Sequence, residues 1–422
     1  VLFLGGPLHF LKGLQERFKE TLKLRDQEAN FPELAPYFVA LGSAVYAANE
    51  TVDFSYEELL EKMEAMACKK VQTAGLPPLF ESDEDYEEFK KRHTSASVER
   101  SDIHTYRGNA YLGIDAGSTT TKLVLIDEQC RILYESYAGN MGNPVDVVQK
   151  ELAKLYALME DRIHIIHSAV TGYGEELMKH AFHLDIGVVE TIAHYHAAHY
   201  FNPQVDFIID IGGQDMKCFR IRDNTIDDIL LNEACSSGCG SFIETFAKSM
   251  GYDIQEFARM GLAGKHPVDL GTRCTVFMNS SVKQAQKNGA SMEDISAGLC
   301  MSVVKNALYK VIRAKSPDDI GKQIVVQGGT FLNDTVLRSF ELELGRNVIR
   351  PSISHLMGAY GAALIAKEKK ATASSLLKKE DIDSFTHSSK AFHCALCTNH
   401  CNLTVNTFAD GAKMEQTICK SG

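Results

Sequence analysis

The chain has 422 residues, of which 45% are hydrophobic and 23% are charged, so it is long enough for two or three domains whose apolar cores need no disulfide bonds. Its net charge of -11 and isoelectric point near 5.8 argue against a broad surface for nucleic acid or anionic membranes, which would require an excess of lysine and arginine. No apolar run approaches the ~20 residues of a membrane span and the first residues lack the basic lead of a signal peptide, so we expect a cytoplasmic protein with no nucleic-acid or membrane partner.

Residues 1–48 contain the first copy of an internal repeat. The stretch LFLGGPLHFLKGLQERF matches IVVQGGTFLNDTVLRSF at residues 324–340, and in both copies a proline, Pro32 or Pro351, stands ten residues before a glycine in an alanine-rich run. Long strand and helix patterns precede the second copy, whereas only four residues precede the glycine pair of the first. We therefore expect residues 1–48 to be the C-terminal remnant of a preceding domain of the same kind.

Residues 49–108 are expected to form a helical connector and linker. The run FSYEELLEKMEAMACKK predicts a short amphipathic helix. The acidic run ESDEDYEEFKKRH, which follows GLPPLF, indicates a solvated face.

Residues 109–368 combine strand and helix patterns. AYLGIDAGSTTTKLVLID predicts a strand, a turn of glycine and hydroxyl residues, and a returning strand, and RILYESYA adds a third strand to this antiparallel start. RIHIIHSAVTG and VDFIIDIGGQD predict buried strands separated by helices. From GSFIETFAKSMG to LYKVIRA the pattern is mostly helical, before a strand in QIVVQGG. The expected fold class is α/β with mixed sheets.

Three glycine-bearing turns in this region follow strands, and two of them have an aspartate at the strand end, Asp115 and Asp210. Glycine lets backbone N–H groups approach phosphate oxygens, hydroxyl side chains add donors, and an aspartate can hold a magnesium ion or orient an attacking water. A single such turn is more often plain backbone geometry than a ligand site. Two phosphate-like turns and a third in VVQGGTF suit a nucleotide clamped between two halves of a domain, although neither Walker A nor GxGxxG is present.

The order and sequence of these turns resemble the actin, Hsp70 and sugar-kinase superfamily of ATPases. The resemblance implies an actin-like (RNase H-like) two-lobed ATPase domain with mixed sheets flanked by helices, and SHLMGAYGAALIA as the helix packed between the two halves. It assigns catalytic positions to Asp115, Asp210 and Gln214, with both aspartates lining the Mg²⁺ site. The residues that it assigns to ATP are Gly117, Ser118, Thr119, Thr120 and Lys122 in the first turn, Gly212 and Gly213 in the second, and Gly328, Gly329 and Thr330 at the nucleoside.

Two cysteines narrow the resemblance. Cys235 in EACSSGCGSF and Cys274 in TRCTVF resemble the cluster-binding segments of the ATP-dependent activators of 2-hydroxyacyl-CoA dehydratases, a family that includes the ATPase subunits of benzoyl-CoA reductases. The resemblance covers residues 110–367, including Glu190 and His194. In that family two cysteines from each of two subunits hold one 4Fe-4S cluster, which implies Cys235 and Cys274 as the metal ligands here.

A cluster that takes four thiolates needs two such faces, so the resemblance implies a homodimer or a pseudo-dimer with a missing ATPase domain. The helix predicted after Cys239 would offer unpaired N–H groups to the anionic cluster. Cys239 departs from the family pattern and stays open as a spare thiol, a changed ligand or a neutral residue. The implied activity is ATP hydrolysis coupled to single-electron transfer in anaerobic metabolism, with ferredoxin or flavodoxin as donor and a dehydratase or reductase as acceptor.

Other classes of site and function remain open. Cys235 and Cys274 would also suit a zinc ion between protomers, since zinc accepts thiolates equally well, or they bind no metal. The same nucleotide turns would serve a small-metabolite or sugar kinase without a redox role. A non-redox scaffold ATPase would use them for nucleotide-driven binding of a partner protein.

The remaining cysteines fall into two groups. Four scattered ones, Cys68, Cys130, Cys218 and Cys300, are expected to be buried and inert. Residues 369–422 are expected to be a linker and the start of a cysteine-containing segment, which resembles the next domain of long activators with two fused ATPase domains. Its thiols suit an iron-sulfur or zinc site, or stay free at the surface, and are Cys394, Cys397, Cys401 and Cys419, with His393 and His400 nearby.

Overall fold

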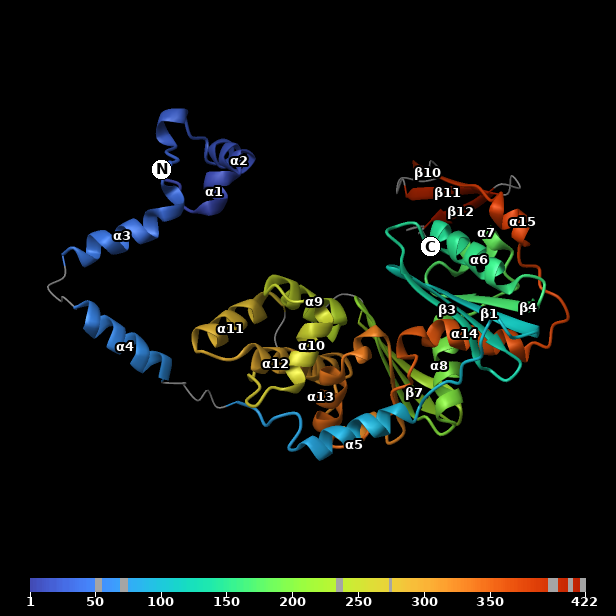
Figure 1. Cartoon of the computed structure of the whole chain (residues 1–422). Helices are drawn as coiled ribbons and strands as arrows, with labels where there is room; N and C mark the ends of the chain where they lie inside the picture. Colours follow the sequence, from blue (N-terminus) through green and yellow to red (C-terminus); the bar gives the residue numbers. More distant parts are fainter. Residues whose placement is uncertain are drawn as a thin grey trace. The chain divides into compact units, whose positions relative to one another are not determined.

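The computed structural model describes residues 1–49, 55–68, 75–232, 238–272, 275–393, 401–408 and 413–417. The chain forms two compact units, Val1–Lys70 and Val71–Gly422 (Figure 1). Among the described residues, no helix is long and apolar enough to cross a membrane.

The first unit is helical and small. Its helices are α1 (Gly6–Phe10), α2 (Lys12–Leu22), α3 (Phe38–Ala47) and α4 (Tyr56–Cys68), with 3-10 turns at Asp26–Glu28 and Ala35–Tyr37. Phe3 is its buried centre and stacks on Phe31 with ring centroids 4.6 Å apart. Helix α3 has no buried residue, although its sequence is mostly apolar.

The repeat seen in the sequence extends to the backbone geometry of its two copies. Gly5 has φ 96° and ψ 163°, and its counterpart Gly328 has φ 93° and ψ 159°, both in the left-handed region that favours glycine. In each copy the glycine lies beside a parallel bridge, Leu2 to Asn30 in the first and Val325 to Ile349 in the second. The two copies are therefore the same structural unit.

The first sheet of the second unit has the strand order β3-β2-β1-β4-β5, in which β1 pairs antiparallel with β2 and parallel with β4. The antiparallel start predicted from the sequence is confirmed. Leu123 and Leu125 face the helices α6 and α7, whereas Val124 faces α8 and α14. The elements are β1 (Gly108–Ala116), β2 (Thr120–Asp127), β3 (Ile132–Gly139), β4 (Ile163–Thr171), β5 (Ile186–Gly187), α6 (Pro144–Met159), α7 (Glu175–Phe182), α8 (Glu190–Phe201) and α14 (Met357–Glu368).

The second sheet repeats this pattern with the order β8-β7-β6-β9, in which β6 pairs antiparallel with β7 and parallel with β9. Its strands are β6 (Phe207–Ile211), β7 (Met216–Arg222), β8 (Thr225–Asn232) and β9 (Ile324–Gln327). The sequence prediction contains β6 and β9 but not the β7–β8 hairpin. That hairpin turns at Asp223 (φ 49°) and Asn224 (φ 56°), two positive values that a type I′ turn requires.

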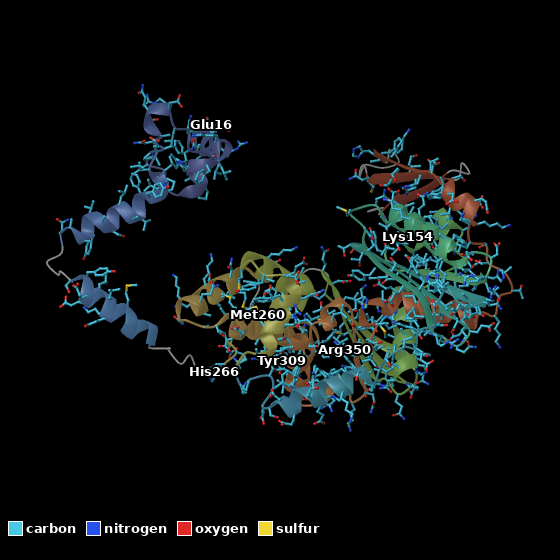
Figure 2. The ribbon with its side chains drawn as sticks, in the orientation of Figure 1. Glu16, Lys154, Met260, His266, Tyr309 and Arg350 are labelled. Atoms are coloured by element: carbon cyan, nitrogen blue, oxygen red, sulfur yellow. The ribbon has the colours of Figure 1, made fainter. Side chains whose placement is uncertain are left out.

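Helices follow β8, as predicted, and form the apolar core over the second sheet. They are α9 (Gly240–Ser249), α10 (Ile254–Leu262), α11 (Thr275–Lys287), α12 (Met292–Lys305) and α13 (Asp334–Leu344), with short turns at Pro317–Ile320, Gly329–Leu332 and Ser354–Leu356. Helix α12 continues as a π-helical turn, Asn306–Val311. Its Tyr309, labelled in Figure 2, donates to Glu343 Oε1 of α13 at 2.5 Å.

Helix α14 closes the fold between the two sheets, as the resemblance implied. Its first ten residues, Met357 to Ala366, are all buried. A Cβ on Gly113 of β1 would clash with the backbone of Ala359, and one on Gly361 would clash with the carbonyl of Ala193 in α8. Backbone therefore lies directly on backbone at both contacts.

Helix α5 (Asp83–Thr94) forms from the acidic run before the first sheet. The expected solvated face is present, but the opposite face packs on α13. Arg92 Nη2 lies 2.6 Å from Glu341 Oε2 and His93 Nε2 lies 3.0 Å from Glu341 Oε1. Asp85 accepts two hydrogen bonds from Arg338 Nη2, at 2.7 and 3.0 Å.

The C-terminal residues form α15 (Lys379–Asp383) and an antiparallel sheet of β10 (His387–His393), β11 (Asn402–Phe408) and β12 (Lys413–Thr417). They pack on the first sheet's helices, since Phe385 stacks on Phe182 with ring centroids 4.9 Å apart. Asp185 also holds the preceding segment by accepting from Ser374 Oγ at 2.5 Å and Ser375 N at 2.6 Å. With these sheets flanked by helices, the predicted mixed α/β class is confirmed.

Candidate functional site

The first glycine turn connects β1 to β2 and places Asp115 beside Lys122. These residues are direct cross-strand partners, and Lys122 Nζ lies 2.9 Å from Asp115 Oδ2. Burial alone would lower the pKa of Lys122, but the carboxylate of Asp115 raises it overall. The lysine therefore stays charged and holds one oxygen of the buried aspartate.

Asn140, just after β3, braces this turn and has no sequence signature. It is 2% exposed. Its Nδ2 donates to the carbonyl of Gly117 at 2.6 Å, and its backbone N–H donates to the carbonyl of Thr119 at 2.8 Å. Its Oδ1 accepts from Thr121 Oγ1 at 2.5 Å. These bonds fix the path of the turn while the side chains of Ser118 and Thr119 remain exposed.

The second glycine turn follows β6 and leaves Asp210 buried at the strand end. Burial raises the pKa of Asp210, and the nearby charges of His194 and Lys217 oppose that rise. His194 Nδ1 of α8 lies 3.2 Å from Asp210 Oδ2, and Gln327 Nε2 of β9 lies 2.8 Å from the same ring nitrogen. A buried carboxylate of this kind gains from a cation, because a neighbouring positive charge stabilises its ionised form.

The third glycine turn follows β9 and contacts the second. A Cβ on Gly328 would lie 2.6 Å from Asp210 Oδ1, so only glycine fits there. Thr330 is buried, and its Oγ1 donates to the carbonyl of Gly212 at 2.9 Å. The second and third turns therefore form one hydrogen-bonded unit.

Asp115 and His194 both lie beside Gly358 at the start of α14. A Cβ on Gly358 would lie 2.8 Å from Asp115 Oδ2 and 3.0 Å from His194 Nε2. His194 in turn contacts Asp210, so it links the ends of β1 and β6. The structure thus brings together Asp115, Lys122, Asp210 and the three turns. The side chains or backbones left exposed around them are those of Ser118, Thr119, Gly213, Gln214 and Gly329.

Glu190 and His194, both noted in the sequence, extend the charge network on α8. Lys217 Nζ lies 2.5 Å from Glu190 Oε1 and 3.2 Å from Asp215 Oδ2. Burial acts to lower the pKa of Lys217, but Glu190 and the other carboxylates raise it overall. A second fixed cation therefore stands beside the second turn.

Cys235 and Cys274 lie outside the described residues, but the start of α9, five residues after Cys235, is anchored to the second turn. Helix α9 begins at Gly240, whose N–H donates to the carbonyl of Gly212 at 3.1 Å, while Ser241 N–H donates to the carbonyl of Gly213 at 2.8 Å. These amides, expected to face a cluster, are instead used by the glycine turn. Cys239 is fully buried in the apolar core.

The other cysteines differ among themselves. Cys218 and Cys300 are fully buried, as expected, and burial raises the pKa of Cys300 to about 12 and that of Cys218 further. Cys130 corrects the expectation, because it is only half-buried and its Sγ lies 3.0 Å from Lys367 Nζ.

The cysteine-rich tail is only partly described. Cys401 is buried at 7% exposure. The other three thiols, those of Cys394, Cys397 and Cys419, lie outside the described residues, as does the side chain of Cys68. Within the part of the chain that the structure covers, no three His, Cys, Asp or Glu side chains are grouped to hold a metal ion.

The two aspartates and the three glycine turns together fit a magnesium-bound nucleotide. Mg²⁺ usually takes one or two protein carboxylates and completes its shell with water and phosphate oxygens, so Asp115 and Asp210 are sufficient. The exposed hydroxyls and glycine amides of the turns are donors for phosphate oxygens. Asp115 already has Lys122 as an ionic partner. Burial raises the pKa of Asp210, and a metal ion beside it would offset that rise by favouring the ionised carboxylate.

Comparison with known proteins identifies the family of this chain. Residues 112–366 match the BadF/BadG/BcrA/BcrD ATPase family. The 2-hydroxyisocaproyl-CoA dehydratase activator of Clostridioides difficile is 31% identical over 259 residues, which are 60% of this chain and 94% of that protein.

Two solved structures share the fold. Component A of the (R)-2-hydroxyglutaryl-CoA dehydratase of Acidaminococcus fermentans has a TM-score of 0.55 at 27% identity and covers 62% of this chain and 98% of its own. The activator of the 2-hydroxyisocaproyl-CoA dehydratase from Clostridium difficile, with bound ADPNP, has a TM-score of 0.54 at 31% identity over 62% of this chain and 95% of its own. The predicted actin-like ATPase fold is confirmed. The chain therefore belongs to the BadF/BadG/BcrA/BcrD ATPase family.

Proposed function

We propose that this chain is an ATP-hydrolysing iron-sulfur protein that drives low-potential single-electron transfer to a 2-hydroxyacyl-CoA dehydratase or a benzoyl-CoA reductase-type partner. Membership of the ATPase family and similarity to dehydratase activators over nearly their whole length support this function. The same similarity disfavours the small-metabolite or sugar kinase.

The nucleotide is proposed to lie where the three glycine turns meet. Asp115 and Asp210 would hold Mg²⁺, and Gln214 would orient the attacking water from its exposed position in the second turn. Lys122, kept charged by Asp115, would stabilise negative charge that develops on the transferred phosphate. The remaining proposed contacts to ATP come from Gly117, Ser118, Thr119, Thr120, Gly212, Gly213, Gly328, Gly329 and Thr330.

Cys235 and Cys274 are proposed to supply two thiolates to a 4Fe-4S cluster, with the other two coming from a second copy of the chain or from another ATPase domain. A cluster bound in this way supplies one-electron transfer. Its donor would be ferredoxin or flavodoxin.

One carbonyl oxygen carries the proposed coupling between the nucleotide and the cysteines. The oxygen of Gly212 accepts from Thr330 in the third turn and from Gly240 at the start of α9. A nucleotide that moves the second turn would therefore move the helix that follows Cys235.

The proposed coupling needs a free energy no larger than that of ordinary allosteric proteins. Allosteric couplings are typically about 1 to 3 kcal/mol, which corresponds to roughly 40 to 130 mV for one electron at about 2.3 kcal/mol per 100 mV.

The first unit is proposed to be part of another ATPase domain. Residues 1–48 have the turn and bridge geometry of the second copy. The apolar side chains of α3 are nevertheless exposed, with Val39 at 84% and Val45 at 66%, whereas those of α14 are buried. An apolar helix of this kind is normally covered by a sheet. We propose the boundaries 1–48 for this part, 49–108 for a connector, 109–368 for the ATPase domain and 369–422 for the linker and cysteine-containing segment.

The direct test is iron and sulfide content with EPR on protein purified without oxygen, with and without ATP. About four irons per pair of ATPase domains and a nucleotide-sensitive signal are expected. The variant Cys235→Ser should lose the iron but still bind ATP, and Cys130→Ser is the matched control that should keep both. A zinc-containing protein, or a colourless one whose ADP release depends on a small alcohol substrate, would contradict the proposal and favour a zinc site or a kinase.

A further inference from the structure

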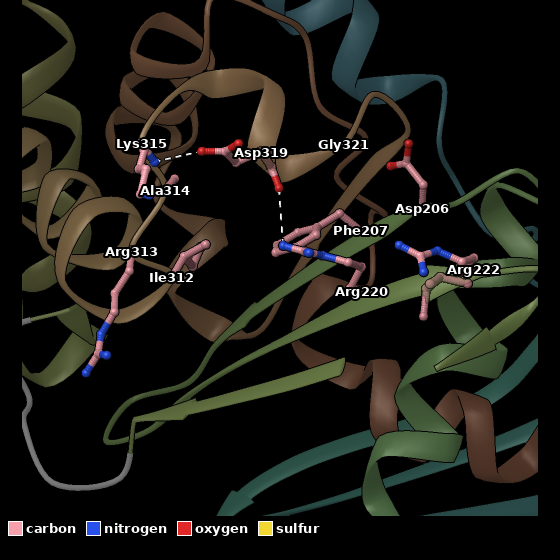
Figure 3. Close-up of a pocket in the computed structure, with 11 residues that line it drawn as sticks. Asp206, Phe207, Arg220, Arg222, Ile312, Arg313, Ala314, Lys315, Asp319 and Gly321 are labelled. Carbon is pink, nitrogen blue, oxygen red and sulfur yellow. Dashed lines mark hydrogen bonds between the residues drawn. The ribbon is translucent and has the colours of Figure 1, made fainter. Parts of the chain in front are cut away.

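A cavity of about 570 Å³ lies at the end of the second sheet where β6 begins and β7 ends, and plays no part in the site described above (Figure 3). It is lined by the start of β6, the end of β7 and the segment between the π-helical turn and β9. Phe207 of β6 lines it, whereas Asp210 lies three residues further along the same strand. At about 3.3 Å per residue, the glycine turn is roughly 10 Å or more from the cavity.

The lining of this cavity is strongly basic. Its charged residues are four cations, Arg220, Arg222, Arg313 and Lys315, and two carboxylates, Asp206 and Asp319. The whole chain is acidic, with a net charge of -11, so a concentration of cations around one cavity stands out against the rest of the chain.

Both carboxylates are engaged by backbone N–H groups. Asp206 accepts from the backbone N–H of Lys322 at 2.7 Å and of Gln323 at 2.8 Å. Asp319 Oδ2 accepts from the backbone N–H of Lys315 at 2.8 Å and of Ser316 at 3.0 Å. Both side chains hold the loop before β9 in shape and keep their negative charge, so the four cations and two carboxylates of the lining leave an excess of two positive charges.

Arg220 is the central cation. Its guanidinium extends across the cavity from β7 toward the loop, and Nη2 donates to the carbonyl of Asp319 at 3.3 Å (Figure 3). Arg222, two residues along the strand, lies only 3.5 Å from Asp227 Oδ2 and shares its charge with that carboxylate. Arg313 has a left-handed backbone, φ 58°, which is unusual for a residue other than glycine.

We infer that this cavity binds a small polyanion with two or more phosphate groups. Guanidinium groups match phosphate oxygens with paired hydrogen bonds, and several cations around one cavity suit more than one phosphate. The volume lies within the range of about 300 to 1,000 Å³ that is usual for small-molecule sites. Buried Phe207, Ile221 and Ile312 form an apolar floor that excludes water from one side.

The ligand has two possible chemical sources, an inorganic polyphosphate or a nucleoside polyphosphate, and calorimetry distinguishes them. ADPNP is titrated first. If two molecules bind per ATPase domain, the second site takes nucleosides. If one binds, tripolyphosphate is titrated into the ADPNP-saturated protein, and binding then assigns the cavity to the inorganic chain.

The variant Arg220→Gln should weaken this second binding event by at least about tenfold, because it removes a charged hydrogen-bond donor, and leave the first unchanged. Arg259→Gln is the matched control, since Arg259 is exposed on α10 and does not line the cavity. Thermal unfolding of both variants checks that they fold. The inference is overturned if the native protein binds one ADPNP and no tripolyphosphate at millimolar concentration, or if Arg220→Gln binds both as the native protein does.

Discussion

Replacing Gly240 by alanine perturbs the contact between the second and third glycine turns and the helix that follows Cys235. A Cβ at this position would lie 2.6 Å from Thr330 Oγ1, whereas its distances of 3.5 Å to the carbonyl oxygen of Gly212 and 3.7 Å to Gly213 Cα are ordinary. To reach the 3.4 Å at which ordinary contact begins, the hydroxyl and the new methyl must separate by about 0.8 Å. The hydroxyl would leave the carbonyl of Gly212 to do so.

The opposing effects can be weighed. Loss of the hydrogen bond from Thr330 costs about 1 kcal/mol, and strain from overpacking adds about 1 kcal/mol or more. Alanine favours the helix over glycine by about 0.5 to 1 kcal/mol. We expect a net decrease of about 1 kcal/mol in the free energy of unfolding. The double variant Gly240→Ala with Thr330→Ala should lack the strain, so that the two changes show a coupling of about 1 kcal/mol.

The assay is urea unfolding together with ATP hydrolysis and the nucleotide-dependent EPR signal. ATP hydrolysis should persist in Gly240→Ala, but ATP should change the signal much less than in the native protein. Gly238→Ala is the matched control, because its Cβ meets no atom closer than 3.8 Å. If Gly240→Ala keeps the native stability and the full response to ATP, as the control should, the proposed path through Gly212 is refuted.

Asp115→Asn and Asp210→Asn should each lower the ATPase rate by about 100-fold or more, because each removes a charge from the proposed magnesium site; native rates in both variants would exclude this site. Asn140→Ala should lower the free energy of unfolding by about 2 to 3 kcal/mol and weaken ATP binding, measured by urea unfolding and calorimetry, because the two buried side-chain hydrogen bonds to Gly117 and Thr121 are lost. Burial alone would raise the pKa of Glu341, but His93 and the neighbouring positive charges lower it overall, so its contribution to stability is present above the ordinary carboxyl pKa and is lost as the pH falls through the folded value. Glu341→Gln should therefore flatten the acid limb of stability measured by urea unfolding across that range, and an unchanged acid limb would contradict this role.

Local patterns predict the strands β1, β2 and β3 well, because alternating apolar residues and a glycine turn act within a few residues of one another. The β7–β8 hairpin escapes prediction even though Asp223 and Asn224 favour its turn. Its strands contain charged residues, such as Arg220 and its cross-strand partner Asp228, which obscure the alternating apolar pattern.

Side chains that act over long distances in the sequence could not be identified. Asn140 contacts the first turn through residues 19 and 23 positions away, and Asp85 pairs with Arg338 253 positions later. No local pattern distinguishes such residues from ordinary polar ones. The repeat could be identified from the sequence, because both copies need a glycine for the same left-handed backbone conformation.

The direct contact of α14 with β1 has a consequence for synthesis on the ribosome. Gly113 is translated roughly 250 residues before Ala359, whose backbone covers it, and at about 5 to 20 residues per second this delay is about 12 to 50 s. During that interval this face of the first sheet lacks the cover that α14 provides. A chaperone that binds nascent chains would therefore be expected to cover this face until α14 has been synthesised and can pack on it.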